Sequence, residues 1–180
     1  MQVRYQPRAD RVLWQLRTQE GQLFAIWLTR RMLRQLWPPL QRLVAEGEVA
    51  QVVARGAAPG QPPPTVLPEA REMLAQVARE RPLPGTDFRQ PFDTRPAEQP
   101  LGAEPLLPEQ VDLGPGSDGR GLHLRLREPG GRQLGLQLSA DLATALMRLL
   151  EAALRKADWG VLPAPAAAAA VAPAAPTVLN

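Results

Sequence analysis

The stretch RVLWQLRTQEGQLFAIWLTRRMLRQL, residues 11–36, determines the predicted fold. Apolar side chains alternate with other residues along both of its halves. They lie at Val12, Trp14 and Leu16, and again at Phe24, Ile26 and Leu28. This alternation on either side of a turn at Gly21 predicts a β-hairpin with one face in the core.

A helix is predicted to follow the hairpin, because Thr29 is a residue type that caps helices. The predicted inner face of the helix comprises Met32, Leu33, Leu36, Leu40, Leu43 and Val44. Pro38 and Pro39 fall within this helix and are expected to kink it or to split it, because proline lacks the N–H that a helix interior needs.

The same design recurs 110 positions later without a gap. Leu122, Leu124 and Leu126 correspond to Val12, Trp14 and Leu16, whereas Leu134, Leu136 and Leu138 correspond to Phe24, Ile26 and Leu28. Gly131 corresponds to the turn residue Gly21, and Ser139 to the cap Thr29. Few residues are identical, so the repeat is one of pattern, and we interpret it as an internal repeat, with convergence on a common motif as the alternative.

The repeat predicts an α+β fold in a single domain over residues 1–160. Two β-hairpin-α units, residues 11–55 and 119–158, are expected to pair into a four-stranded antiparallel sheet with both helices on one face. Residues 56–118 are rich in proline and are predicted to be a linker that contains a short helix over 68–80. Residues 162–180 are almost entirely Ala and Pro and are predicted to be a disordered tail.

The run FAIWLTRR, Phe24 to Arg31, resembles a strand-to-helix run in bacterial proteins of unknown function. The resemblance covers about the first 35 residues. It implies no activity.

Composition limits the functional classes. The chain has 180 residues and no cysteine, which excludes disulfides. Its formal net charge is only +3, which by itself is weak evidence for a polyanion partner. The N-terminal residues lack the apolar core of a signal peptide, and no apolar run is long enough to span a membrane. We therefore predict a cytoplasmic protein without a membrane partner.

Catalytic chemistry has little support in the sequence. The one histidine, His123, alternates away from the core, and no cysteine or second histidine could complete a soft metal site. The glycines between Gly114 and Gly121 precede a predicted strand rather than a helix, unlike a phosphate-binding loop. We predict neither a metal, nor a cofactor, nor an enzyme.

The outer face of the predicted sheet is the candidate binding surface. It would carry Trp27 with basic and ring side chains that stack on bases and neutralise phosphates. The candidate residues are Trp27, Arg17, His123, Arg125 and Arg127, with Arg30, Arg31 and Arg34 added from the first helix. Leu13, Leu23 and Trp27 are apolar where an open sheet is normally polar, so this face is alternatively covered. The cover would be the linker, through Phe88, Phe92, Leu106 or Leu107, or another copy of the protein.

Three functional hypotheses follow. The first is a non-catalytic protein-interaction module that self-associates or binds a protein partner through a sheet face or an edge strand. The second is a single-stranded DNA- or RNA-binding protein that uses the Trp27 and arginine surface. The third, with the least support, is an enzyme.

Overall fold

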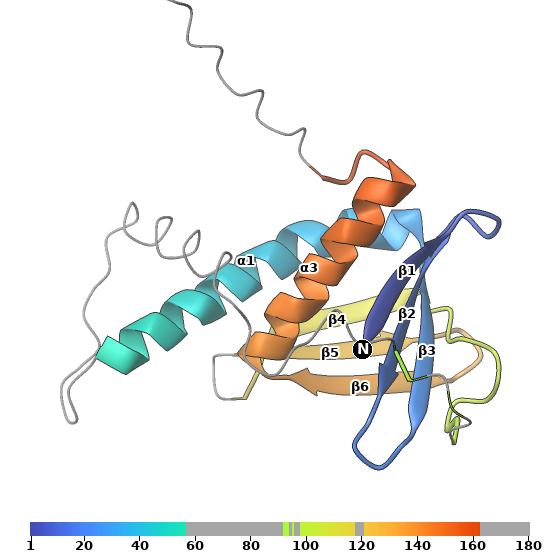
Figure 1. The fold of residues 1–180 in the computed structure, drawn as a ribbon, viewed down its shortest axis with the longest axis horizontal. Helices are drawn as coiled ribbons and strands as arrows, with labels where there is room; N and C mark the ends of the chain where they lie inside the picture. Colours follow the sequence, from blue (N-terminus) through green and yellow to red (C-terminus); the bar gives the residue numbers. More distant parts are fainter. Residues whose placement is uncertain (57–91, 94, 96–97, 118–120, 163–180) are drawn as a thin grey trace, which may run out of the picture.

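The computed structural model describes residues 1–56, 92–93, 95, 98–117 and 121–162 (Figure 1). The predicted helix over 68–80 and the Ala/Pro tail from residue 163 lie outside the described residues. The elements follow in the order β1 (Gln2–Gln6), β2 (Arg11–Arg17), β3 (Leu23–Leu28), α1 (Arg30–Gly56), β4 (Gln110–Pro115), β5 (Leu122–Arg127), β6 (Gln133–Leu138) and α3 (Ala140–Ala157).

Each half of the chain forms a three-stranded antiparallel meander followed by a helix. The strand orders are β1-β2-β3 in the first sheet and β4-β5-β6 in the second. Val12 lies opposite Leu28 in the first sheet, as Leu122 lies opposite Leu138 in the second. The outer pairs follow the same offset, since Val3 lies opposite Trp14 and Leu113 opposite Leu124. The 110-residue repeat therefore extends through β1 and β4.

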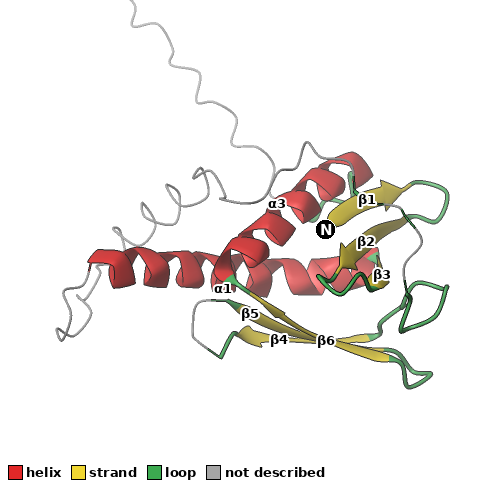
Figure 2. Ribbon diagram, turned by 60° about the horizontal axis from the view of Figure 1, so that its bottom comes forward, coloured by secondary structure: helices red, strands yellow, loops and turns green. Residues whose placement is uncertain are grey.

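The two units are interlocked through their helices. α1, from the first unit, lies against β4 of the second, and α3 lies against β1 of the first. Figure 2 shows the second sheet as one layer, with the first sheet and both helices packed on the same side of it. The hydrophobic core of each unit is therefore completed by the other unit, because each helix packs against an edge strand of the other unit's sheet.

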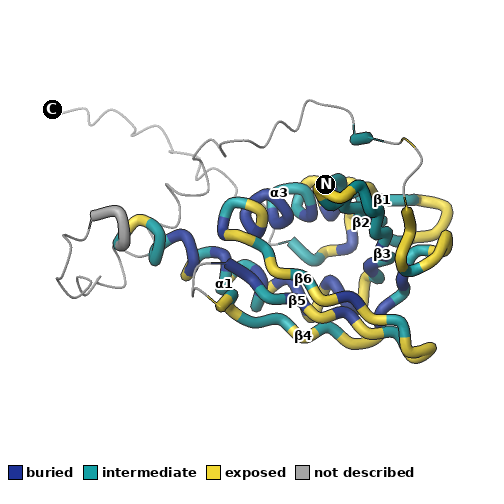
Figure 3. Tube along the Cα trace, turned by 90° about the horizontal axis from the view of Figure 1, so that it is seen from below, coloured by how far each residue is buried: buried dark blue, intermediate teal, exposed yellow. Residues whose placement is uncertain are grey.

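One hydrophobic core is shared by both sheets and both helices. Its fully buried side chains include Trp14, Ile26, Leu28, Leu33, Leu40, Leu106, Leu122, Leu124, Leu126, Leu146 and Leu150. Along the strands, buried and exposed residues alternate as expected when one face packs inward (Figure 3). The predicted inward positions of both hairpins are confirmed at Val12, Trp14, Leu122 and Leu124.

The predicted four-stranded sheet is wrong. The structure has two separate three-stranded sheets, because β1 pairs with β2 and β4 pairs with β5, so each hairpin is completed by a strand from its own half of the chain. Neither strand was predicted. β1 offers only Val3 and Tyr5 as an apolar alternation, whereas β4 lies in the proline-rich stretch interpreted as linker and ends in Gly114 and Pro115.

The prolines do not divide the first helix. α1 runs continuously from Arg30 to Gly56 with Pro38 and Pro39 inside it. Leu36, Trp37 and Leu40 are buried on either side of the two prolines. This packing offsets the hydrogen bonds that the prolines remove, which in an isolated helix would cost about 3 kcal/mol each.

The segment before β4 covers the open edge of β3. Leu106 donates its amide to the carbonyl of Ala25 at 2.8 Å and accepts from the amide of Trp27 at 2.7 Å, forming a parallel bridge opposite Ile26. Leu23 also donates to the carbonyl of Glu98 at 2.8 Å. Leu106 thus joins the core at 0 % exposure and does not cover the outer face of the sheet.

Candidate binding surfaces

The residues predicted to form one binding surface lie on three separate parts of the molecule. Trp27 and Arg17 lie on the outer face of the first sheet. His123, Arg125 and Arg127 lie on the outer face of the second. Arg30, Arg31 and Arg34 belong to the beginning of α1. The expected platform of Trp27 with Arg125 and Arg127 is not assembled, because the two hairpins do not share a sheet.

The outer face of the first sheet combines half-buried apolar side chains with arginines. Arg4, Leu13 and Trp27 form one row across the three strands. Arg17 at the far end of β2 is paired with Asp93 and donates to the carbonyl of Arg95. Arg4 on β1 and Arg11 at the start of β2, which shares a strand face with Leu13, were not predicted as site residues. Arg4 was missed because β1 was not recognised as a strand, although Val3 and Tyr5 continue the repeat pattern.

The outer face of the second sheet is polar, as is usual for an open antiparallel sheet. Arg125 and Arg127 are exposed and His123 is half-buried. Arg127 donates to Asp112 on β4 at 2.6 Å, so part of its charge is neutralised within the sheet. No aromatic side chain accompanies these residues on the described strands β4 to β6, so base stacking has no support on this face.

The beginning of α1 is strongly basic. Arg30, Arg31 and Arg34 are exposed, and the first turn contains no acidic residue. Because a helix N-terminus already carries partial positive charge, arginines there are unfavourable unless they meet a negative group. α3 shows the usual arrangement, with Asp141 in its first turn and Arg155 and Lys156 in its last.

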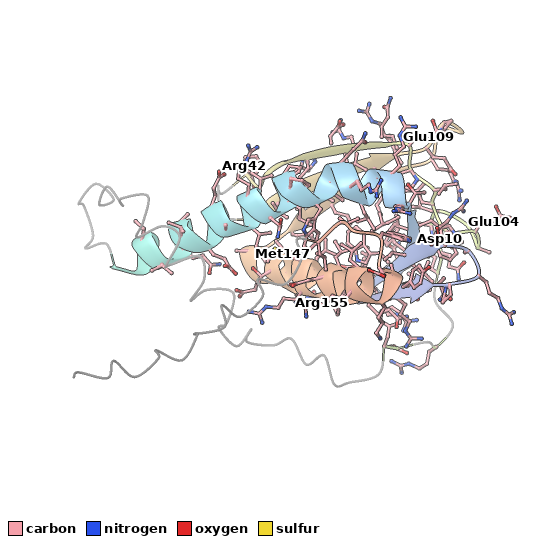
Figure 4. The ribbon with its side chains drawn as sticks, turned by 90° about the horizontal axis from the view of Figure 1, so that it is seen from above. Asp10, Arg42, Glu104, Glu109, Met147 and Arg155 are labelled. Carbon is pink, nitrogen blue, oxygen red and sulfur yellow. The ribbon has the colours of Figure 1, made fainter. Side chains whose placement is uncertain are left out.

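Two of these arginines are held in place by Trp159, the second residue after the end of α3. Arg30 and Arg34 both donate to the carbonyl oxygen of Trp159, at 3.1 and 3.2 Å. The Trp159 indole N–H donates to Asp10 at 2.8 Å, and its ring meets Tyr5 edge to face with centroids 5.5 Å apart. Figure 4 shows Asp10 at the end of the molecule where α1 begins. The carbonyl oxygen of Trp159 thus orients the guanidinium groups of Arg30 and Arg34, and each group keeps further N–H donors that could bind a ligand.

Hydrogen bonds determine the ionisation of Asp10 in this cluster. Its carboxylate accepts from Trp159 and from the hydroxyl of Tyr5 at 2.9 Å. These bonds, with the charge of Arg30, lower the pKa of Asp10 below its ordinary value. The hydrogen bond to Asp10 raises the pKa of Tyr5, because the neutral hydroxyl is the donor.

Among the described residues, no strand pairs with the outer edge of β6. The closing pair of the hairpin, Glu128 and Arg132, fixes which residues of β6 bond β5, so the amides and carbonyls of Gln133, Gly135 and Gln137 face outward. Within the described residues, no backbone group bonds these outward groups. All three residues are exposed, and a Cβ at Gly135 would meet no described atom within 4 Å.

On the equivalent edge of the first sheet, the segment with Leu106 reduces the exposure of the inward-facing side chains of β3. Ile26 and Leu28 of β3 are 0 % and 1 % exposed, because the segment with Leu106 lies beside them. Their counterparts Leu136 and Leu138 remain half-exposed at the edge of β6. The second sheet therefore leaves inward-facing leucines incompletely covered.

A cleft of about 590 Å³ lies between the first half of α1 and the segment that leads into β4. It is lined by Thr29, Arg31, Met32, Gln35, Leu36, Pro39, Leu107, Pro108, Glu109, Val111 and Leu113. Arg31 and Glu109 supply opposite charges to this lining, and Met32, Leu36 and Val111 supply apolar surface.

Within the described ranges, no three His, Asp or Glu side chains are grouped so that they could hold a metal ion. Of the described helices, none combines the length and apolar character that crossing a bilayer requires. The chain matches no protein-family model, and no curated protein or solved structure matches it.

Proposed function

We propose that the chain is a non-catalytic protein-interaction module that binds an extended segment of a partner along the open edge of β6. The observation that carries the proposal is the row of outward backbone groups on Gln133, Gly135 and Gln137. Addition of a strand to such an edge gives affinity through main-chain hydrogen bonds.

The side chains of β6 support this role. Natural edge strands are usually protected against pairing by charge, proline or a bulge. The strand QLGLQL contains no charged residue and no proline, and its register with β5 is continuous. A partner strand would also cover Leu136 and Leu138, as the segment with Leu106 covers the equivalent positions of β3.

The chain supplies its own probe for this edge. A labelled peptide with the sequence of residues 98–107, the segment that pairs with β3, is expected to bind β6 in trans. Gln137→Pro removes an outward N–H without disturbing the bonds to β5, so it should abolish binding. Gln137→Ala keeps the N–H and should bind as the wild type does. Absence of peptide binding by the monomeric chain, or equal affinity in all three proteins, would contradict the proposal.

A second candidate function is binding of single-stranded nucleic acid at the beginning of α1. The oriented guanidinium groups of Arg30 and Arg34 beside Arg31 favour it, because fixed arginines at a helix N-terminus suit phosphates. The half-buried Trp27 on the adjoining strand β3 offers a ring close in sequence to these arginines.

Salt dependence tests this second candidate. Labelled single-stranded oligonucleotides should bind with an affinity that falls as salt rises. Arg31→Ala removes a guanidinium that makes no bond within the described residues, so it should reduce the slope of log K against log salt by about 0.7. Arg42→Ala, an exposed arginine further along α1, is the matched control and should leave the slope unchanged. Equal slopes in the two variants would exclude this site.

A further inference from the structure

We infer that the partner at the edge of β6 is a second copy of this chain, paired antiparallel about Gly135. The inference rests on the proposed function and names its partner. The resulting dimer would join two second sheets into one continuous antiparallel sheet across a two-fold axis. Such an isologous contact uses the same surface on both copies.

The sequence of β6 is symmetric about its centre. Gln133-Leu134-Gly135-Leu136-Gln137 reads the same in both directions. Antiparallel pairing of two copies with Gly135 on the axis places Gln133 opposite Gln137 of the second copy. It also places Leu134 opposite Leu136 of the second copy. Every residue of this stretch thus meets a chemically matched residue.

The hydrogen-bonding pattern agrees with this register. Residues that exchange both hydrogen bonds across an antiparallel pair must all direct their backbone groups toward the partner. Gln133, Gly135 and Gln137 direct theirs outward, whereas Leu134 and Leu136 direct theirs to β5. Pairing about Gly135 brings outward residues opposite outward residues only. A shift by one residue would bring them opposite residues whose groups are already used.

The side chains also fit on both faces of the joined sheet. On the inner face, leucine meets leucine and the half-exposed Leu136 is covered. On the outer face, the glutamines lie opposite one another, and amide side chains both donate and accept hydrogen bonds. No like charges become directly opposed, which would destabilise the pair.

The other sheet edges are occupied. β1 and β4 lie against α3 and α1, and β3 is bonded to the segment with Leu106. In the part of the chain that the structure describes, β6 is the edge strand without such a cover. Figure 1 shows β6 along the margin of the second sheet, on the side away from β4 and α1.

The association of two double charge variants tests the proposed register, in which residue 133 lies opposite residue 137 of the second copy. In the double variant Gln133→Lys/Gln137→Lys, each lysine would face a lysine of the second copy. In Gln133→Lys/Gln137→Glu, each lysine would face a glutamate. Molar mass by light scattering across a range of concentrations should approach twice the chain mass of 19.7 kDa for the wild type and the Lys/Glu variant. The Lys/Lys variant should dissociate at a concentration about tenfold higher or more.

A single-cysteine variant reads the register independently, because the chain has no cysteine. Opposed residues that exchange hydrogen bonds lie about 5.5 Å apart at Cα, within the range of a disulfide. Gly135→Cys should therefore give a covalent dimer on oxidation. Arg125→Cys, exposed on the central strand of the same sheet, should not.

The outcomes separate the inference from the proposed function. A wild type that is monomeric at every concentration but binds the 98–107 peptide would overturn the inference and leave the proposed function standing. A monomer that binds no peptide would overturn both. Equal association of the Lys/Lys and Lys/Glu variants, with far-UV circular dichroism unchanged, would also overturn the inference.

Discussion

Thr144 of α3 donates a hydrogen bond to Glu48 of α1, with 2.8 Å between Oγ1 and Oε1, and both side chains are buried. This contact is a polar bridge between the helices of the two units. The other carboxylate oxygen, Oε2, has no partner among the described residues. The same hydroxyl lies 3.0 Å from the carbonyl of Ala140, so its one proton serves one acceptor at a time.

Removal of the hydroxyl should therefore destabilise the protein. Thr144→Val keeps the shape of the side chain but leaves the Glu48 carboxylate without its donor, at a cost of about 1–3 kcal/mol. Urea unfolding followed by circular dichroism measures this loss. The double variant Glu48→Leu/Thr144→Val removes both partners and should recover most of the stability. A double variant less stable than Thr144→Val would show that the bridge is not the cause.

Leu106 is expected to hold the connecting segment on the first sheet. Leu106→Ala removes a side chain that is 0 % exposed and should lower the free energy of unfolding by about 2–5 kcal/mol. Leu107→Ala is the matched control, because Leu107 is only half-buried and its truncation should cost less. Similar losses in the two variants would mean that Leu106 has no special place in the core.

The free energy of unfolding should decrease at acid pH, in part because Asp10 becomes protonated. Its folded pKa lies below the ordinary value of 3.8, so in that region the unfolded chain binds more protons and stability rises with pH. The stabilisation is present above about pH 4 and is lost as the pH falls through the folded pKa. Asp93, whose pKa is lowered chiefly by hydrogen bonds from Arg95, adds to the loss in the same direction.

The variant Asp10→Asn isolates the share of Asp10. Asparagine tolerates the positive φ of 46° found at this position and can still accept from Trp159. Stability curves against pH should therefore be shallower below pH 4 for the variant, and Asp93, Glu20 and Glu128, whose pKa values are also lowered, contribute to the slope that remains. Identical acid slopes in wild type and variant would exclude a role for the Asp10 carboxylate.

Gly121, just before β5, is expected to tolerate no side chain. A Cβ there would clash with the backbone carbonyl oxygen of Leu138 on β6. Gly121→Ala should therefore lower the thermal midpoint, whereas Gly114→Ala on β4, where the space is open, should change it little. Equal midpoints for the two variants would contradict the pairing of β5 with β6 at this end.

Local features were predictable from the sequence. The turn glycines Gly21 and Gly131 have positive φ values of 84° and 88°, which residues with a Cβ rarely adopt. Thr29 and Ser139 accept hydrogen bonds from the amides of Met32 and Leu142, at 3.3 and 3.4 Å, as expected of helix caps. These features depend on residues close in sequence, which is why pattern alone specified them.

The assignment of strands to sheets was not predictable in the same way. It depends on pairings between distant residues and on β1 and β4, whose short or glycine- and proline-containing sequences carry a weak strand signal. The candidate site was wrong for the same reason, because it assumed that both hairpins share one sheet. Trp27 and Arg125 do point away from the core, but they do so from different sheets. The difference between the edges of β3 and β6 was not predictable either, because β3 is covered by Leu106, a residue distant in sequence.

Amide hydrogen exchange at β6 tests the central claim most directly. Exchange rates of the outward amides of Gln133, Gly135 and Gln137 would be compared by NMR in dilute and concentrated solution. The account predicts fast exchange in dilute solution and marked slowing on concentration, while Leu134 and Leu136, which face β5, stay slow throughout. Equally fast exchange of the three outward amides at both concentrations would contradict it.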